Sequence, residues 1–239
     1  KEWSNNCEKQ DTRRCMSIAY KILDCINSEE LVTEKWNLLG IYSFENPLRV
    51  GIRELIDWLI SISACPYILT GDSIEAAEEV AKRAGFPNKM IRLSKLKDLI
   101  EVSSRLNELD HNRITLVISG KCLIESLKQN RESTIRFLDI DRFPKVIYRA
   151  SREVKCEVSN VINRGLYVGD AANDALAIEN SLVGIALKHG AEICRLKADM
   201  VIKTPKDLIE LLLENGYRDM LLAGGERLLQ DVCWMAGLT

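Results

Sequence analysis

Short apolar runs alternate with segments of helical periodicity from residue 38 to residue 215, and this alternation limits the fold more than any other feature. Residues 50–62 place apolar side chains at helical spacing, and residues 67–70 form a short apolar run that ends at Gly71. The β-branched run at residues 114–118 is typical of a buried strand. Strands that alternate with helices form a mainly parallel sheet with helices on both faces. We therefore expect an α/β, Rossmann-like doubly wound fold.

Two of the predicted strand ends carry residues that could bind ligands, which in such sheets lie at the carboxyl ends of strands. Residues 69–72 (L-T-G-D) place Thr70, Gly71 and Asp72 before a helix whose free N–H groups suit an anion. Residues 169–174 (G-D-A-A-N-D) supply two carboxylates and an amide directly after an apolar strand. Hard oxygen donors at a strand end suit Mg²⁺. Helix capping and simple turns are the alternative explanation for both segments.

Basic side chains follow the strand predicted at residues 146–148. Arg149 stands at the end of that strand, and Lys155 lies on the next predicted helix. A lysine ammonium is a point charge that can neutralise a phosphoryl group. A lone lysine is more often a solvated surface residue, but here the three segments occur in order and each lies beside a strand. Together they indicate a phosphate and magnesium site.

The order Thr-Gly-Asp, Lys, Gly-Asp-x-x-Asn-Asp resembles the haloacid-dehalogenase superfamily, and longer strings resemble the phosphorylation domain of P-type ATPases within it. Residues 169–174 stand for the G-D-G-x-N-D of that family, residues 183–186 (V-G-I-A) follow at the expected place, and residues 44–49 (F-E-N-P-L-R) resemble its D-P-x-R segment. Three further segments resemble the phospholipid-transporting (flippase) class: residues 14–20, 116–123 and 143–155. The resemblance runs over most of the chain and implies a haloacid-dehalogenase-like fold.

The resemblance implies roles for individual residues. Asp170 would bind Mg²⁺ with support from Asp174, and these two residues would act in catalysis together with Lys155. ATP or the transferred phosphoryl group would be bound by Arg14, Thr70, Gly71, Asp72, Arg149, Lys155, Asn173 and Asp174. The implied cofactors are Mg²⁺ and ATP.

The resemblance also divides the chain into three parts. Residues 1–37 would end a nucleotide-binding domain, residues 38–215 would form the carboxy-terminal part of the phosphorylation domain, and residues 216–239 would form a connector toward a membrane stalk. The parent would be a multi-pass membrane protein with this segment in the cytoplasm. Its phospholipid substrate would bind to membrane segments outside this chain, and an accessory membrane subunit is a partner that this class often has.

Several residues depart from the family pattern. The family's phosphorylated aspartate lies in a D-K-T-G-T motif, which does not occur in this sequence, so the chain alone is not expected to form a phosphoenzyme. Ala171 replaces a glycine, Arg152 replaces a proline, and Asn46 and Ser119 each replace an acid. Three hypotheses therefore stay open: part of an ATP-driven lipid transporter, a soluble phosphatase of the same superfamily, and a non-catalytic regulatory relative.

Composition argues against several other functions. The 239 residues carry a net charge of -2 with no basic block, so nucleic-acid binding is not expected. Eight cysteines are scattered without a C-x-x-C pair and only two histidines accompany them, which disfavours a zinc site. Hydrophobic residues make up 46% of the chain, enough for a buried core. No apolar run reaches the roughly 20 residues of a membrane helix.

Overall fold

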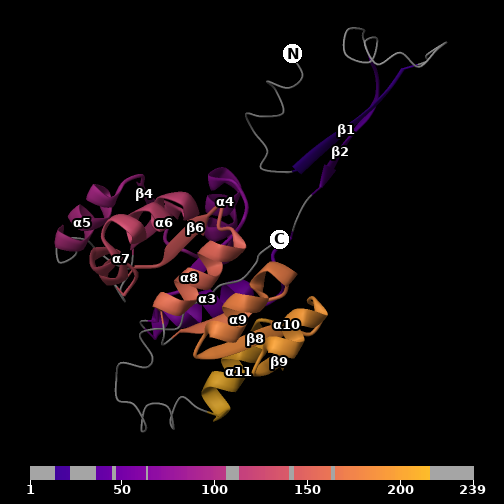
Figure 1. Ribbon diagram of the computed structural model, residues 1–239. Coiled ribbons are helices and arrows are strands. Elements are labelled where there is room, and N and C mark those ends of the chain that lie inside the picture. The colour runs from indigo at the N-terminus through magenta and orange to yellow at the C-terminus, as the bar shows by residue number, and fades with distance from the viewer. Residues whose placement is uncertain are drawn as a thin grey trace. The chain divides into compact units, whose positions relative to one another are not determined.

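The chain divides into two compact units at the bond between Pro47 and Leu48. The computed structural model describes residues 14–21, 36–44, 47–62, 64–105, 113–139, 143–162 and 165–215. The first unit contains an antiparallel pair of strands, β1 (Arg14–Tyr20) and β2 (Asn37–Phe44), and the second contains the parallel strands and the helices (Figure 1). The three domains expected from the sequence, with boundaries at residues 37 and 215, stay a prediction.

Two parallel sheets form the centre of the second unit. One has the strand order β3-β6-β5-β4 and the other the order β7-β8-β9, and every pairing within them is parallel. The strands are β3 (Tyr67–Leu69), β4 (Lys89–Leu93), β5 (Ile114–Ser119), β6 (Lys145–Tyr148), β7 (Leu166–Gly169), β8 (Val183–Leu187) and β9 (Met200–Ile202). The predicted α/β fold with a mainly parallel sheet is confirmed.

Helices connect these strands, as the alternating pattern predicts. They are α3 (Ile52–Ser61), α4 (Ile74–Ala84), α5 (Leu96–Arg105), α6 (Gly120–Gln129), α7 (Arg131–Leu138), α8 (Arg152–Val161), the 3-10 turn η3 (Ala172–Asp174), α9 (Ala175–Asn180), α10 (Glu192–Lys197) and α11 (Lys206–Asn215). The apolar pattern did not predict α10, because Cys194 is its one buried residue. No helix within the described ranges is long and apolar enough to cross a membrane.

The two sheets share a core on each of their faces. Leu69 of β3 and Tyr167 of β7 belong to one cluster of buried side chains, whereas the adjacent residues Ile68 and Val168 belong to a second cluster. Neighbouring residues of a strand point to opposite faces of its sheet. The two sheets therefore lie in one layer between two sets of helices, which is the doubly wound arrangement. In Figure 1, β8 and β9 with α9, α10 and α11 form one end of this unit, and β4 with α5 and α7 forms the other.

The terminal strands β3 and β7 differ from the other two terminal strands in burial. All residues of β3 and β7 are buried, whereas β4 and β9 each have exposed positions. Among the described strands, β3 pairs only with β6 and β7 pairs only with β8. Because β3 and β7 also share both core clusters, the junction between the two sheets lies at these two strands.

Candidate phosphate and magnesium site

A buried ion pair joins the end of β7 to the helix that follows β6. The Lys155 Nζ donates to Asp174 Oδ1 at 2.8 Å, and the two side chains are 3% and 0% exposed. The Tyr167 hydroxyl donates to the same oxygen at 2.8 Å, and the Ala171 N–H donates to Asp174 Oδ2 at 3.1 Å. A buried charge is tolerated when it has a counter-ion and hydrogen bonds. Asp174 has both.

Asp170 is the more accessible carboxylate at this strand end. Its side chain is 13% exposed, and its Oδ2 accepts a hydrogen bond from the Arg49 guanidinium in an ion pair. Burial raises the pKa of Asp170 above the ordinary value of an aspartate, and the charge of Arg49 opposes that rise. The backbone carbonyl of Asp170 accepts a hydrogen bond from the Ala191 N–H at 2.6 Å, which fixes the loop on that side. Asp170 is therefore the carboxylate at this strand end that keeps some exposed surface, and its loop is held in place.

The Thr-Gly-Asp segment is fastened to the end of β6 through its backbone. The Ala150 N–H donates to the Thr70 carbonyl at 2.8 Å, and the Arg149 N–H donates to the Asp72 carbonyl at 3.0 Å. The Thr70 hydroxyl donates to Asp72 Oδ2 at 2.9 Å. Arg149 has a φ of 47°, in the left-handed region, a strained conformation that persists where the surroundings hold it and that clusters at functional sites. The carboxyl ends of β3 and β6 are thus tied together.

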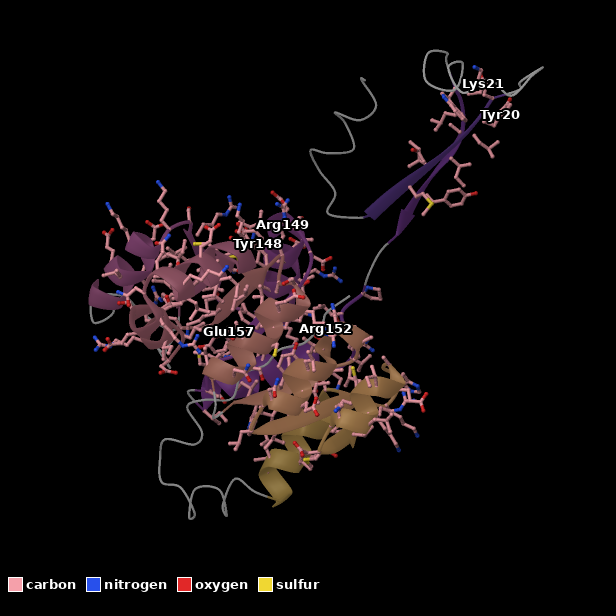
Figure 2. All side chains as sticks on the ribbon, in the orientation of Figure 1. Tyr20, Lys21, Tyr148, Arg149, Arg152 and Glu157 are labelled. Carbon is pink, nitrogen blue, oxygen red and sulfur yellow. The ribbon has the colours of Figure 1, made fainter. Side chains whose placement is uncertain are left out.

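The end of β6 and the start of α8 connect the predicted site residues to one another. Arg149 contacts the Thr-Gly-Asp loop, and Lys155, on α8 just after it, contacts Asp174. Figure 2 shows Arg149 at the end of β6 and Arg152 at the start of α8, both exposed at the surface.

Three predicted residues have fewer described contacts. Gly71 and Asn173 lie exposed in their loops. Arg14 belongs to β1 in the first unit, and its side chain lies outside the described residues, so its role at ATP stays a prediction. Asn46 also lies outside the described residues.

Three of the departures from the family pattern have local explanations. Ala171 has a φ of -95°, a conformation open to any residue, so the alanine does not distort the loop. Ser119 caps the start of α6 with its side chain. Ser151 caps α8 directly before Arg152, so this helix begins with a cap although the proline is absent.

Replacing Ala171 with glycine should therefore lower the free energy of unfolding by about 0.5–1 kcal/mol, because glycine gains freedom in the unfolded chain. The backbone N–H that donates to Asp174 is retained in this variant. Denaturant unfolding of the purified chain measures the change. Divalent-cation binding should not fall, and a large fall would show that the loop depends on the alanine methyl group.

Four residues at the site were not predicted from the sequence as site residues: Arg49, Tyr167, Gly190 and Cys194. Tyr167 could have been identified from the sequence as a candidate site residue, because the hydroxyl of a tyrosine in a wholly buried strand needs a hydrogen-bond partner. The Cys194 thiol donates to the Ala171 carbonyl at 2.9 Å, and burial raises its pKa to about 11. Cys194 therefore remains a neutral thiol that anchors the loop.

The donor set fits a magnesium ion whose coordination is completed by phosphate and water. Mg²⁺ is usually bound through one or two carboxylates, and its other positions are filled by water and phosphate oxygens. Asp170 can supply one oxygen, whereas Asp174 has no exposed surface and its two oxygens already accept hydrogen bonds. Asp174 is therefore suited to support the site from behind Asp170. Within the described ranges, no three His, Cys, Asp or Glu side chains are grouped so as to hold a metal ion.

Comparison with known proteins gives relatives of consistent type, although no family model matches the chain. Calcium-transporting ATPase type 2C member 1 from Homo sapiens is 25% identical over 201 residues, which cover 81% of this chain and 18% of that protein. Phospholipid-transporting ATPase VD from Macaca fascicularis is 28% identical over 217 residues, which cover 80% of this chain and 33% of that protein. Probable phospholipid-transporting ATPase 5 from Arabidopsis thaliana is 22% identical over 222 residues, which cover 79% of this chain and 18% of that protein.

These relatives transport different substrates by their names, but a similar share of this chain, about 80%, matches each of them. The chain spans between about a sixth and a third of the length of the curated relatives it matches. Together with the parallel α/β fold and the motif order, these matches to P-type ATPases support the interpretation of the chain as a fragment of such a protein.

Proposed function

We propose that this chain is the carboxy-terminal part of the cytoplasmic head of an ATP-driven P-type phospholipid translocase, and that it binds Mg²⁺ and the transferred phosphoryl group. The observation that carries the proposal is the buried pair of Lys155 and Asp174. This pair joins α8 to the end of β7, which bears the G-D-A-A-N-D segment. Helix α8 follows β6, and the end of β6 is hydrogen-bonded to the Thr-Gly-Asp loop. Phosphoryl transfer depends mainly on positioning and on neutralising charge, and this arrangement supplies both.

Each described residue has a role in this proposal. The hydroxyl of Thr70 donates one hydrogen bond to a phosphoryl oxygen, and in the absence of phosphate it donates to Asp72, which orients it. Lys155 is a fixed positive charge, because Asp174 and the surrounding burial leave its side chain little freedom. Asp170 supplies an oxygen to Mg²⁺, which when bound offsets the negative charge of the phosphoryl group.

The nucleophilic aspartate comes from a segment outside this chain, and the junction between the sheets provides a place for it. β3 and β7 are buried terminal strands at that junction. A parallel strand inserted between them would pair with both, and its carboxyl end would lie beside Thr70 and Asp170.

The phospholipid class is the finer part of the proposal. It is supported by the resemblance of residues 14–20, 116–123 and 143–155 to that class and by the 28% identity with a phospholipid-transporting relative. Calcium-transporting relatives match as well. In the proposal the parent is a membrane protein with this segment in the cytoplasm, the lipid binds to its membrane segments, and an accessory membrane subunit accompanies it.

A phosphorylation assay tests the proposal. A longer polypeptide that includes the upstream segment should incorporate labelled phosphate from ATP in a Mg²⁺-dependent and hydroxylamine-sensitive manner, as expected for an acyl phosphate. Asp170→Asn in that polypeptide should reduce the incorporation strongly. Lipid vesicles and calcium ions, added separately, then distinguish the two transporter classes by the stimulation of ATP hydrolysis.

The same assay separates the alternatives. Failure of the longer polypeptide to form any acyl phosphate would favour the non-catalytic relative. Hydrolysis of a phosphate monoester by the purified 239-residue chain would favour the soluble phosphatase. The chain carries no D-K-T-G-T motif, so such hydrolysis could not proceed through the phosphoenzyme of a P-type ATPase. Stimulation by calcium and not by lipid would leave the family intact and overturn the phospholipid class.

A further inference from the structure

The positively charged side chain of Arg49 forms an ion pair with Asp170, the carboxylate that is proposed to bind Mg²⁺. Its guanidinium donates to Asp170 Oδ2, the side chains being 39% and 13% exposed. Arg49 lies in the turn before α3, where its carbonyl accepts a hydrogen bond from the Ile52 N–H at 3.2 Å. The proposed phosphoryl chemistry does not use this residue. Its contact with Asp170 therefore needs a separate explanation.

A mostly buried carboxylate is costly to leave without a counter-ion. Lys155 makes its direct ion pair with Asp174. Arg49 is thus the described cation in direct contact with Asp170.

We propose that Arg49 is an internal counter-cation that holds Asp170 until a divalent cation binds and displaces it. This inference rests on the proposed function, in which Asp170 is a metal ligand. The guanidinium has donors only, so it cannot share in coordinating a metal ion and competes with it for the same oxygen. Its partial exposure lets the side chain withdraw into water. Arg49 is therefore a positioning residue that lowers the affinity for the cation while holding its ligand in a fixed orientation.

Binding of Mn²⁺ to the purified chain, measured by electron paramagnetic resonance, tests the inference, since Mn²⁺ prefers the same oxygen ligands as Mg²⁺. Arg49→Gln should bind Mn²⁺ about fivefold more tightly than the unmodified chain, as expected for the loss of one partly exposed ion pair. Arg49→Lys should restore the weaker affinity. Arg53→Gln is the matched control, because Arg53 lies on α3 in an exposed ion pair with Asp57 and should leave the affinity unchanged.

Hydrogen exchange provides a second measurement that a merely structural role would not affect. Mn²⁺ should increase the exchange of the Ile52 amide in the unmodified chain, because displacement of Arg49 loosens the turn that this amide closes. The increase should be absent in Arg49→Gln. An affinity in Arg49→Gln that is equal to or weaker than that of the unmodified chain would overturn the inference.

Asp170→Asn separates this inference from the proposed function. If Asp170→Asn abolishes Mn²⁺ binding while Arg49→Gln leaves it unchanged, Asp170 stands as the metal ligand and the role of Arg49 falls. If Asp170→Asn binds Mn²⁺ like the unmodified chain, or if no variant binds it, the metal role of Asp170 fails and the role of Arg49 fails with it.

Discussion

Replacing Lys155 with methionine should lower the free energy of unfolding of the chain by about 3–5 kcal/mol, the range for removing one partner of a buried ion pair. The cost arises because Asp174 would remain fully buried without its counter-ion. Urea unfolding followed by circular dichroism measures the change. Lys121→Met is the control, since Lys121 is 85% exposed and lies 3.9 Å from Glu125, so its loss should change the stability little.

A double variant identifies the origin of that loss. Lys155→Met combined with Asp174→Asn removes both charges and should regain a large part of the stability lost in the single variant. The amide of the new asparagine can still accept a hydrogen bond from the Tyr167 hydroxyl. A single Lys155→Met variant as stable as the Lys121→Met control would show that the buried pair contributes no more than a surface pair.

Replacing Gly190 with alanine should destabilise the chain by about 1–3 kcal/mol, the usual cost of placing an extra methyl group in a tightly packed site. A Cβ atom at Gly190 would lie 2.7 Å from the Cα and carbonyl oxygen of Asp170, closer than real Cβ contacts allow. The Asp170 backbone must then move, which also disturbs its hydrogen bond with the Ala191 N–H. We therefore expect weaker Mn²⁺ binding together with the loss of stability.

Gly71→Ala is the matched control for this prediction. A Cβ atom at Gly71 would have its nearest neighbour at 3.9 Å, the Ala150 carbonyl oxygen, which is ordinary contact. Its unfolding free energy should stay close to that of the unmodified chain. If Gly190→Ala matches this control in stability and retains full Mn²⁺ affinity, the loop at Asp170 is more adaptable than its packing indicates.

The sequence predicted the layered fold and the strand ends at which the site is built. Both follow from local patterns, because apolar periodicity identifies strands and helices, and Gly71 and Asp170 mark points where strands end. Lys155 was predicted from the order of the motifs, although its buried contact with Asp174 depends on how α8 packs beside β7. Motif order predicts which residues belong to a site but not which of them are buried.

The unpredicted contacts have in common that they join distant parts of the chain. Arg49 meets Asp170 across a long stretch of sequence, and no local pattern predicts that meeting. Helix α10 was missed for a different reason: its side chains at Ile193 and Leu196 are exposed, so it lacks the apolar stripe that identifies a helix. Ala171 appeared to be a departure that alters its loop, and its backbone angle shows that it does not.

The junction at β3 and β7 also bears on how the protein folds. These strands are far apart in sequence, so they can reach one junction only through long-range contacts, which form slowly. Until those contacts form, the apolar strands β3 and β7 can pair with any extended segment, including the same segment of another copy. If the junction accepts a further strand, as proposed, the same feature makes this chain by itself prone to strand exchange and aggregation. In the proposed parent, synthesis of that strand ahead of this chain would shorten the time for which β3 and β7 can pair with other segments.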